Sequence, residues 1–355
     1  HGILAVDDRI IAVAQGTEPF ESVIDMRLNG VVELIRGQRG TTVRLQVMRK
    51  SENGFDTLNF AIVRDKIVLK DGEAKAEIFE PTASTDESPS AYRIGVIELP
   101  SFYVDFNDYK ERNAAKDMEK EIIRLKQEGI QGLVIDLRNN GGGSLQTVVD
   151  MAGFFINEGP VVQVRTSDSG SKVLKDRDGK TLWDGPLVVM VNELSASASE
   201  ILAAAMQDYE RAVVLGSKQT FGKGTVQNII ELNRFVSKST YGDLGALKFT
   251  TEKFYRITGK STQLEGVYSD VVAPDQYAYV DIGEKDEVNP LVWDQISSAS
   301  FNKWDGYQNY QQVIEDSAAR VARDTFFQLI DKNAKWVRTQ QDKNDFSLNY
   351  KLFSN

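Results

Sequence analysis

Two short apolar runs, residues 133–137 and 187–191, are each followed by a loop of small residues and then by a helical pattern. Apolar runs of this length without alternation are typical of parallel strands that are buried on both faces. Another strand at 94–99 and a helix over about 105–127 precede them. Because strands alternate with helices through the middle of the chain, the sequence predicts an α/β fold built on a parallel sheet.

The two ends of the chain show other patterns. Residues 1–75 contain short strand-like runs and one short helical run, 31–35, which predict a small β-rich module. A polar, Pro-bounded segment at 80–90 indicates a linker or surface loop. From about Asp305 the apolar residues follow a helical period. The other predicted elements are strands at 10–14, 42–48, 58–63, 161–165, 212–215 and 226–232, helices from about 144 and over 197–208, and a hairpin turn at Asp178-Gly179.

The composition excludes several classes of site. The 355 residues contain no Cys and a single His, His1, at the chain end. Thiolate nucleophiles, zinc fingers and iron–sulfur sites need Cys, and a Ser-His-Asp triad needs a well-placed His. The net charge of -10 argues against a nucleic-acid partner, because gripping phosphates needs basic patches. If the chain is a hydrolase, its general base is therefore Lys, Asp, Glu or Tyr.

Three serines lie in the loop after the strand at 187–191, within Asn192-Glu193-Leu194-Ser195-Ala196-Ser197-Ala198-Ser199-Glu200. The loop leads into a helix, whose first backbone N–H groups have no intrahelical partner and can face a ligand. A serine there can offer its hydroxyl to a substrate while a neighbouring N–H stabilises an oxyanion. Ser197-x-x-Glu200 also matches a capping box, and helix capping is the better explanation when this segment is taken alone.

A glycine-rich loop after the strand at 212–215 contains two lysines, Lys218 and Lys223, in Gly216-Ser217-Lys218-Gln219-Thr220-Phe221-Gly222-Lys223-Gly224-Thr225. Its spacing does not fit a phosphate-binding loop, which needs four residues between the glycines. A Lys held between Gly222 and Gly224 can instead be desolvated, which lowers its pKa and makes it a usable general base. Taken alone, the loop is more simply explained by a solvated surface Lys.

A glycine run follows the strand at 133–137, in Asp136-Leu137-Arg138-Asn139-Asn140-Gly141-Gly142-Gly143. Glycines let the backbone approach a ligand and expose N–H groups, as an oxyanion hole requires, although a plain turn fits as well. All three loops follow strands expected to be neighbours in one parallel sheet, so they should converge on one crevice. With no placed His, Ser plus Lys is the remaining economical pair of nucleophile and base.

Together these motifs resemble the tail-specific, or carboxyl-terminal processing, serine proteases, especially the long periplasmic type of Gram-negative bacteria. The resemblance rests on residues 136–143, 195–200 and 220–227 and on the stretch from Lys253 to Val267, and it covers nearly the whole chain. The sequence departs from the family pattern at Ser217-Lys218-Gln219, where the loop is one residue longer.

The resemblance implies roles for particular residues. Ser197 would be the nucleophile, Lys223 the general base, and Gln227 would position that Lys. The oxyanion hole would use the N–H of Ala198 and a glycine N–H, for which Gly143 is favoured and Gly142 is the alternative. Asp208 would have a supporting role. The resemblance implies no metal and no cofactor.

The resemblance also implies a domain organisation. Residues 1–75 would be a truncated PDZ domain that starts after its carboxylate-binding loop, with Val31 and Ile35 on the groove helix. Residues 76–275 would be the Ser/Lys protease core, an α/β fold of crotonase-like ββα units, and 276–355 a partial, mainly helical C-terminal region. The expected substrates are proteins or peptides with unstructured apolar C-termini, and the expected partner is an adaptor lipoprotein. The expected location is the periplasm, at the inner-membrane surface, which the absence of Cys also fits.

Two rival functions remain open. A crotonase-like core could act as an acyl-CoA hydratase with the same glycine oxyanion hole, but Ser197 and Lys223 would then be idle. A non-enzymatic PDZ scaffold that binds peptides is the other, and the presence of Ser197, Lys223 and Gln227 argues against it.

Overall fold

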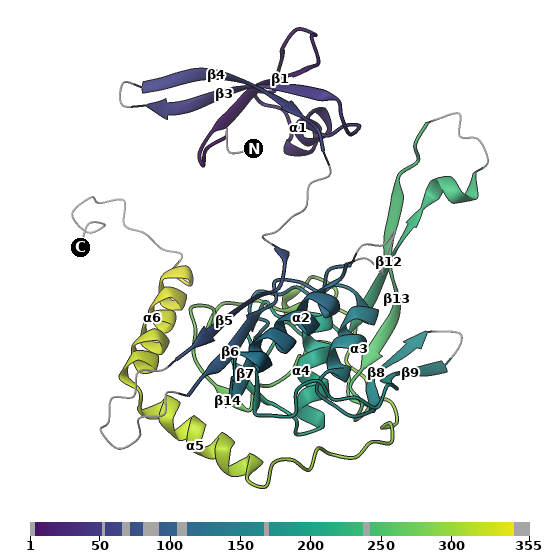
Figure 1. Cartoon of the computed structure of the whole chain (residues 1–355), viewed down its shortest axis with the longest axis vertical. Coiled ribbons are helices and arrows are strands. Elements are labelled where there is room, and N and C mark those ends of the chain that lie inside the picture. The colour runs from purple at the N-terminus through teal and green to yellow at the C-terminus, as the bar shows by residue number, and fades with distance from the viewer. Residues whose placement is uncertain are drawn as a thin grey trace. The chain divides into compact units, whose positions relative to one another are not determined.

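The structure, a computed structural model, describes residues 4–51, 54–65, 72–80, 92–104, 112–166, 170–236 and 242–343. The chain divides into two compact units, residues 1–70 and 71–355, called the first and second units below (Figure 1). The predicted linker at 80–90 falls almost entirely outside the described residues.

The first unit is an antiparallel sheet with one helix. Its strand order is β2-β1-β3-β4, formed by β1 (Arg9–Gln15), β2 (Glu21–Ser22), β3 (Thr42–Ser51) and β4 (Gly54–Val63). Alternate residues of β3, namely Val43, Leu45 and Val47, are buried in its core, and helix α1 (Leu28–Ile35) packs against them. The predicted strands and the predicted helical run of this region are therefore present.

The centre of the second unit is a six-stranded sheet in the order β14-β11-β10-β7-β6-β5. Its strands are β5 (Lys75–Phe79), β6 (Ile94–Glu98), β7 (Gly132–Asp136), β10 (Leu187–Val191), β11 (Val213–Gly216) and β14 (Val271–Val272). The pairings from β6 through β14 are parallel, and only β5 is antiparallel to its neighbour. The predicted α/β fold with a parallel sheet is confirmed. Its first strand begins at Lys75, just inside the region predicted as the first domain.

Three helices pack with this sheet to form the main core: α2 (Ala114–Gln127), α3 (Leu145–Gly153) and α4 (Ala198–Asp208). Leu133 and Ile135 of β7 and Val189 of β10 are almost fully buried in it, and each such side chain contributes about 1.5–3 kcal/mol by leaving water. The residues of α4 from Ala198 to Met206 are all buried, so this helix is enclosed on every side. Its Ser197 end is therefore held rigidly.

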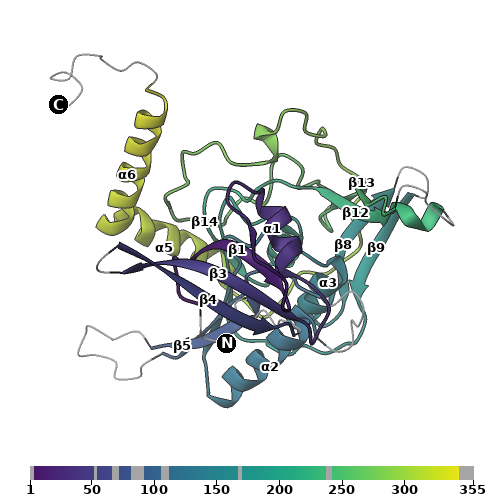
Figure 2. The same ribbon diagram turned by 90° about the horizontal axis from the view of Figure 1, so that it is seen from above.

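A second, antiparallel sheet has the order β12-β13-β8-β9. Its strands are β8 (Gly159–Thr166), β9 (Gly170–Asp176), β12 (Thr225–Glu231) and β13 (Ala246–Tyr255). The outer part of the β12–β13 hairpin extends away from the body of the second unit (Figures 1 and 2). β12 begins two residues after Lys223, so the lysine loop leads directly into this sheet.

Two local predictions need correction. The helix expected over 105–127 begins at Ala114, because Asn113 caps it by accepting a hydrogen bond from the Lys116 N–H at 3.0 Å. Residues 105–111 lie outside the described ranges. Asp178-Gly179 forms a turn after β9 but does not join two strands, since the hairpin of this region is β8–β9.

The C-terminal region is helical only in its second part. After the short 3-10 turn Glu284–Asp286, two helices follow, α5 (Tyr310–Arg323) and α6 (Thr325–Gln341). The segment 276–309 is otherwise irregular, which corrects the prediction of a mainly helical region from 276. Its backbone groups bind the core instead, for example Glu284 N–H to Phe221 C=O at 2.9 Å, and so they satisfy each other without a helix. None of the helices in the described ranges is long and apolar enough to cross a lipid bilayer.

Candidate active site

Ser197 lies at the turn between β10 and α4 in a strained backbone conformation. Its φ is 58° and its ψ is -111°. A residue with a Cβ rarely adopts a positive φ, and such strain persists only where the surroundings enforce it, often at functional sites. Here the buried helix α4 on one side and the buried strand β10 on the other enforce it.

The three serines of this loop differ in their surroundings. Ser195 and Ser199 are fully buried, whereas Ser197 is half-buried. Ser195 Oγ donates to Leu137 C=O at 2.8 Å, and Ser199 Oγ donates to Asn140 C=O at 2.9 Å. These two hydroxyls tie the serine loop to the glycine loop, so only Ser197 is placed to meet a substrate.

Glu200 connects the serine loop to the lysine loop. Its side chain is fully buried, and each carboxylate oxygen accepts two hydrogen bonds. Oε2 accepts from the N–H groups of Ser197 at 2.7 Å and Lys223 at 3.0 Å. Oε1 accepts from the Thr220 hydroxyl at 2.6 Å and the Gly222 N–H at 2.7 Å. One carboxylate therefore sets the distance between the backbones of Ser197 and Lys223.

Burial raises the pKa of Glu200 to about 7, while its four donors act in the opposite direction. All four partners are donors, so this arrangement fits the ionised carboxylate. Protonation would place a donor against donors and weaken the link between the two loops.

Lys223 is half-buried, and its pKa is lowered. Burial is the largest cause and the positive charge of Lys248 adds to it, whereas the charges of Glu284 and Glu200 act to raise the pKa. A lowered pKa makes the neutral amine, the form that can accept a proton, more populated near neutral pH.

The amine of Lys223 donates to Gln227 Oε1 at 3.3 Å. Among the hydrogen bonds of the described residues, none joins the Lys223 amine to the Ser197 hydroxyl. The structure thus brings the backbones of Ser197 and Lys223 together through Glu200, and it places Gln227 beside the Lys223 amine.

The glycine loop lies against the serine turn. A Cβ on Gly142 would lie 2.8 Å from Ser197 Cβ and 3.1 Å from the Ala198 nitrogen. The Gly142 N–H donates to Asn140 Oδ1 at 2.8 Å, so it is already occupied. No hydrogen bond from the N–H of Gly143 or Ala198 is found within the described part of the chain. This difference favours Gly143 over Gly142 as a donor to a bound oxyanion.

Asn140 holds the glycine loop in this shape. It is fully buried, and its Nδ2 donates to Leu99 C=O at 2.7 Å. Gly143 also needs to be glycine, because its φ is 146° and a Cβ would lie 2.3 Å from Phe102 C=O. The loop therefore presents its backbone, with no side chain, beside Ser197.

Two family models match this chain: Peptidase family S41 over residues 93–273, and the C-terminal domain of tail specific protease (DUF3340) over residues 277–355. The Tail-specific protease of Haemophilus influenzae is 39% identical over 349 residues, which are 97% of this chain and 47% of that protein. The chain belongs to peptidase family S41. The predicted resemblance to tail-specific proteases is confirmed.

Other proteins are similar to this S41 family chain. A Carboxy-terminal-processing protease of Bartonella bacilliformis is 34% identical over 262 residues, 72% of this chain and 53% of that protein. The solved structure of a photosystem II D1 C-terminal processing protease has 26% identity and a TM-score of 0.47, and the match covers 75% of this chain and 62% of that one. The chain spans about half the length of the curated relatives it matches.

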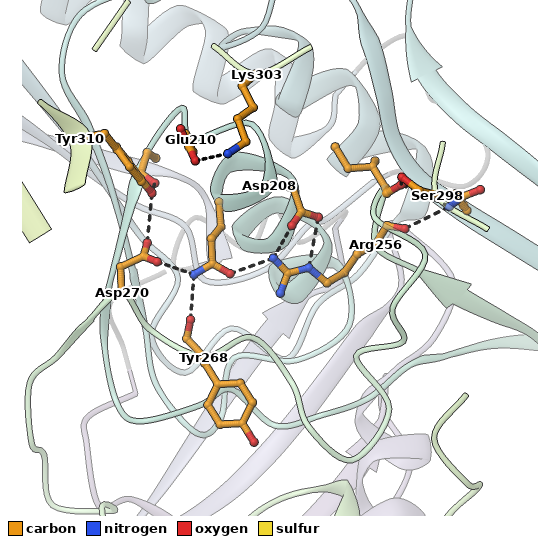
Figure 3. Close-up of polar contacts among 12 residues, drawn as sticks. Asp208, Glu210, Arg256, Tyr268, Asp270, Ser298, Lys303 and Tyr310 are labelled. Atoms are coloured by element: carbon orange, nitrogen blue, oxygen red, sulfur yellow. Dashed lines mark hydrogen bonds and ion pairs between the residues drawn. The ribbon is translucent and has the colours of Figure 1, made fainter. Parts of the chain in front are cut away.

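Ser197 precedes the first residue of α4, and Asp208 is the last residue of that helix. Since an 11-residue helix is about 16 Å long, the two residues lie at opposite ends of it. Arg256 donates to its carboxylate from Nη2 at 2.5 Å and from Nε at 3.1 Å (Figure 3). Arg256 Nη2 also donates to Gln207 Oε1 at 2.9 Å. Asp208 therefore fixes the far end of the helix and does not reach Ser197.

Val31 and Ile35 lie on α1 of the first unit, and both pack against its core. A mostly apolar hollow of about 610 Å³ in this unit is lined by Ile35 together with Ile10, Val43 and Ile62. Val31 does not line this hollow. Val31 and Ile35 are four positions apart on α1, so they lie on the same face of that helix.

The roles of Glu200, Asn140 and Thr220 are not predicted by the sequence patterns. The pattern Ser197-x-x-Glu200 predicts Glu200 only as the partner in a capping box, and the hydrogen bond from Ser197 N–H to Glu200 is formed. Glu200 is the only acidic residue in the first turn of α4, which was a usable signal. Its reach to Lys223, 23 positions along the chain, had no local sequence signal.

Proposed function

We propose that this S41 family chain is the peptidase part of a serine endopeptidase in which Ser197 is the nucleophile and Lys223 the general base. One observation carries the proposal: the N–H groups of Ser197 and Lys223 donate to the same oxygen of the buried Glu200 carboxylate. The only half-buried serine of its loop and a lysine with a lowered pKa are therefore held in one rigid frame.

The chemistry follows from these positions. Ser197 Oγ attacks the carbonyl carbon of the scissile peptide bond, and the neutral Lys223 amine takes the hydroxyl proton. The N–H groups of Ala198 and Gly143 stabilise the negative oxygen of the tetrahedral intermediate. The protonated Lys then gives the proton to the leaving amine, and water releases the acyl-enzyme in a second cycle.

The lysine must turn from Gln227 toward Ser197 during this cycle. Since Glu200 fixes the two backbones, we propose that this movement is a rotation about the side-chain torsions of Lys223. Catalytic hydrogen bonds are often absent or long without substrate and shorten when it binds. Gln227 is a neutral acceptor, so it orients the amine without the strong preference for the charged form that a carboxylate would impose.

For the first unit, the proposed role is recognition of substrate tails as a PDZ domain. Its sheet and single helix α1 are compatible with that fold, and the apolar hollow beside Ile35 suits an apolar side chain of an extended peptide. The proposed substrates are proteins or peptides with unstructured apolar C-termini. The proposed location is the periplasm at the inner-membrane surface, with an adaptor lipoprotein as partner, in keeping with the Cys-free composition.

A fluorophosphonate probe tests the enzymatic proposal. The chain is incubated with the probe, and the labelled residue is mapped by mass spectrometry. Label on Ser197, and loss of label in Lys223→Ala, would support the dyad. A folded chain that takes no label and cleaves no unfolded protein would favour the alternative of a non-enzymatic peptide-binding scaffold.

A further inference from the structure

A second buried polar cluster lies at the start of the lysine loop, residues 216–223. Ser217 Oγ is 2.5 Å from Glu193 Oε2 and 3.0 Å from Asp275 Oδ2. Glu193 is only 8% exposed and Ser217 only 2%. Glu193 follows β10, Ser217 follows β11 and Asp275 follows β14, and these three strands are neighbours in the sheet. They therefore join the serine loop, the lysine loop and the segment after β14.

The number of protons in this cluster can be counted. A serine hydroxyl has one proton, so Ser217 can donate to only one of the two carboxyl groups. The other contact is a hydrogen bond only if that carboxyl group carries a proton and donates it to Ser217 Oγ. With both groups ionised, one contact would set oxygen lone pairs against each other in a buried site, which is costly. The cluster therefore holds one proton more than two free carboxylates would.

The surroundings indicate which group holds the extra proton. Asp275 Oδ1 accepts a hydrogen bond from the Tyr277 N–H at 2.7 Å, and the positive charge of Arg138 acts on Asp275. One oxygen of Asp275 is thus already an acceptor, and its other oxygen is left to accept from Ser217. The pKa of Glu193 is raised, with burial as the largest cause. The hydrogen bond with Ser217 acts to lower it, whereas the charge of Asp275 and a hydrogen bond with Asp275 act to raise it.

Other charges around the cluster do not change this assignment. Asp136, at the end of β7, is bound to Arg138 at 2.6 Å, and Glu98, at the end of β6, also faces Arg138. Both are negative and disfavour a second negative charge nearby. Lys218, the next residue after Ser217, is exposed to water.

We propose that Glu193 is a positioning residue that works in its protonated form, donating to Ser217, which in turn donates to the Asp275 carboxylate. These two hydrogen bonds fix the beginning of the lysine loop, whereas Glu200 fixes its end. The backbone at Gly216 packs closely against β10, because a Cβ on this residue would lie 1.8 Å from the carbonyl oxygen of Val191. The effect on catalysis rests on the proposed function of Lys223, but the proton itself does not.

The sign of the pH effect follows from the raised pKa of Glu193. The stabilisation is present at low pH and is lost as the pH rises through the folded-state value. Ionisation of Glu193 then breaks the hydrogen bond to Ser217 and sets two negative charges on either side of it. We expect the lysine loop to loosen at alkaline pH.

Thermal unfolding of the whole 355-residue chain between about pH 5 and pH 9 tests the proton directly. In Glu193→Gln the amide can still donate to Ser217 but cannot ionise. The melting temperature of the wild type should fall with rising pH by several degrees more than that of the variant. Glu119→Gln, which removes the same charge from an exposed position on α2, should follow the wild type.

Two outcomes would overturn the proposal. The first is a Glu193→Gln chain with the same pH dependence as the wild type. The second is an Asp275→Asn chain that loses the pH dependence while Glu193→Gln retains it, which would place the proton on Asp275.

Peptidase assays then test the link to catalysis. In the wild type, kcat/KM should fall at alkaline pH by about tenfold per pH unit above the folded-state pKa of Glu193. The fall should be absent in Glu193→Gln and unchanged in Glu119→Gln. An alkaline fall that persists in Glu193→Gln would overturn the positioning role. If no variant cleaves and Ser197 takes no label, the proposed function fails, while the unfolding data still decide where the proton lies.

Discussion

Helix α4 has a buried carboxylate near each end, and the two are partnered in different ways. Glu200, in the first turn, accepts hydrogen bonds only from uncharged donors, whereas Asp208, at the last residue, is paired with the Arg256 guanidinium. A helix N-terminus favours negative charge and a C-terminus opposes it, so Asp208 needs a cation that Glu200 does not.

This difference matters for the lysine beside Glu200. The Glu200 carboxylate binds the backbone N–H of Lys223, while the Lys223 amine contacts the neutral Gln227. A direct ion pair with the amine would stabilise its charged form and remove it as a base. The end of α4 at the proposed active site thus has uncharged partners, and the opposite end has an ion pair.

The largest expected effect is at Ser197. Ser197→Ala should lower peptide cleavage by about 10⁴-fold or more with the fold intact, since removing a nucleophile removes the covalent route. Ser195→Ala and Ser199→Ala should keep most of their turnover per folded molecule, with some loss of stability. Cleavage rates of an unfolded protein, with circular dichroism as the folding control, measure this. Wild-type turnover in Ser197→Ala would exclude it as the nucleophile.

Lys223 should come next. Lys223→Arg should be nearly as inactive as Lys223→Ala, with a loss of about 10²–10⁴-fold, because Arg stays protonated and cannot act as a base. If Lys223 only bound a substrate oxygen as a cation, the Arg variant would keep substantial turnover with an unchanged pH profile. A pH–rate series on both variants separates the two roles.

Glu200 should have a smaller effect on rate and a visible effect on pH dependence. Glu200→Gln turns one acceptor oxygen into an NH₂ group that faces two donors, so we expect a loss of about 10²-fold through misplacement of Lys223. In the wild type, activity should fall as the pH drops below about 7, since Glu200 becomes protonated there and its link between the backbones of Ser197 and Lys223 weakens. Fluorophosphonate labelling rates across this range test the expectation, and a wild-type rate in Glu200→Gln would contradict it.

Gln227 should have a modest effect. Gln227→Glu would place a negative charge next to the Lys223 amine and raise its pKa. Turnover near neutral pH should fall several-fold, and the onset of activity should move to higher pH. The matched change Asn228→Asp, one residue further along β12, should leave the onset nearer to that of the wild type. An unchanged onset in Gln227→Glu would remove Gln227 from the site.

Asp208 should affect stability and not turnover. Asp208→Asn leaves the partly buried Arg256 without its counter-ion and should cost about 3 kcal/mol of unfolding free energy. The rate per folded molecule should stay at the wild-type level. Asp281→Asn, which removes an exposed partner of Arg338, should cost only about 0–1 kcal/mol. Urea unfolding measures both, and a large loss of turnover in folded Asp208→Asn would give it a role in the site.

The sequence alone was enough to predict the buried strands and the loops that follow them. The runs at 133–137 and 187–191 match β7 and β10, in which fully buried residues alternate with partly buried ones, so that both faces favour apolar side chains. The strands β9 and β13 were missed because most of β9 and the first half of β13 are exposed, so burial does not impose an apolar pattern on these stretches. The irregular segment 276–309 was also missed, since its backbone is satisfied by partners far along the chain.

The candidate site was located from the sequence, but its internal assignments came from the tertiary structure. Local pattern could name three serines, a lysine and a glycine run, because those residue types are what acyl transfer without His requires. It could not show that Ser195 and Ser199 are engaged by carbonyl groups 58 and 59 positions away. Nor could it show that Asn140 occupies the Gly142 N–H, or that Glu200 joins the backbones of Ser197 and Lys223. These contacts exist only because the parallel sheet sets the ends of β7, β10 and β11 side by side, and sequence distance carries no information about that order.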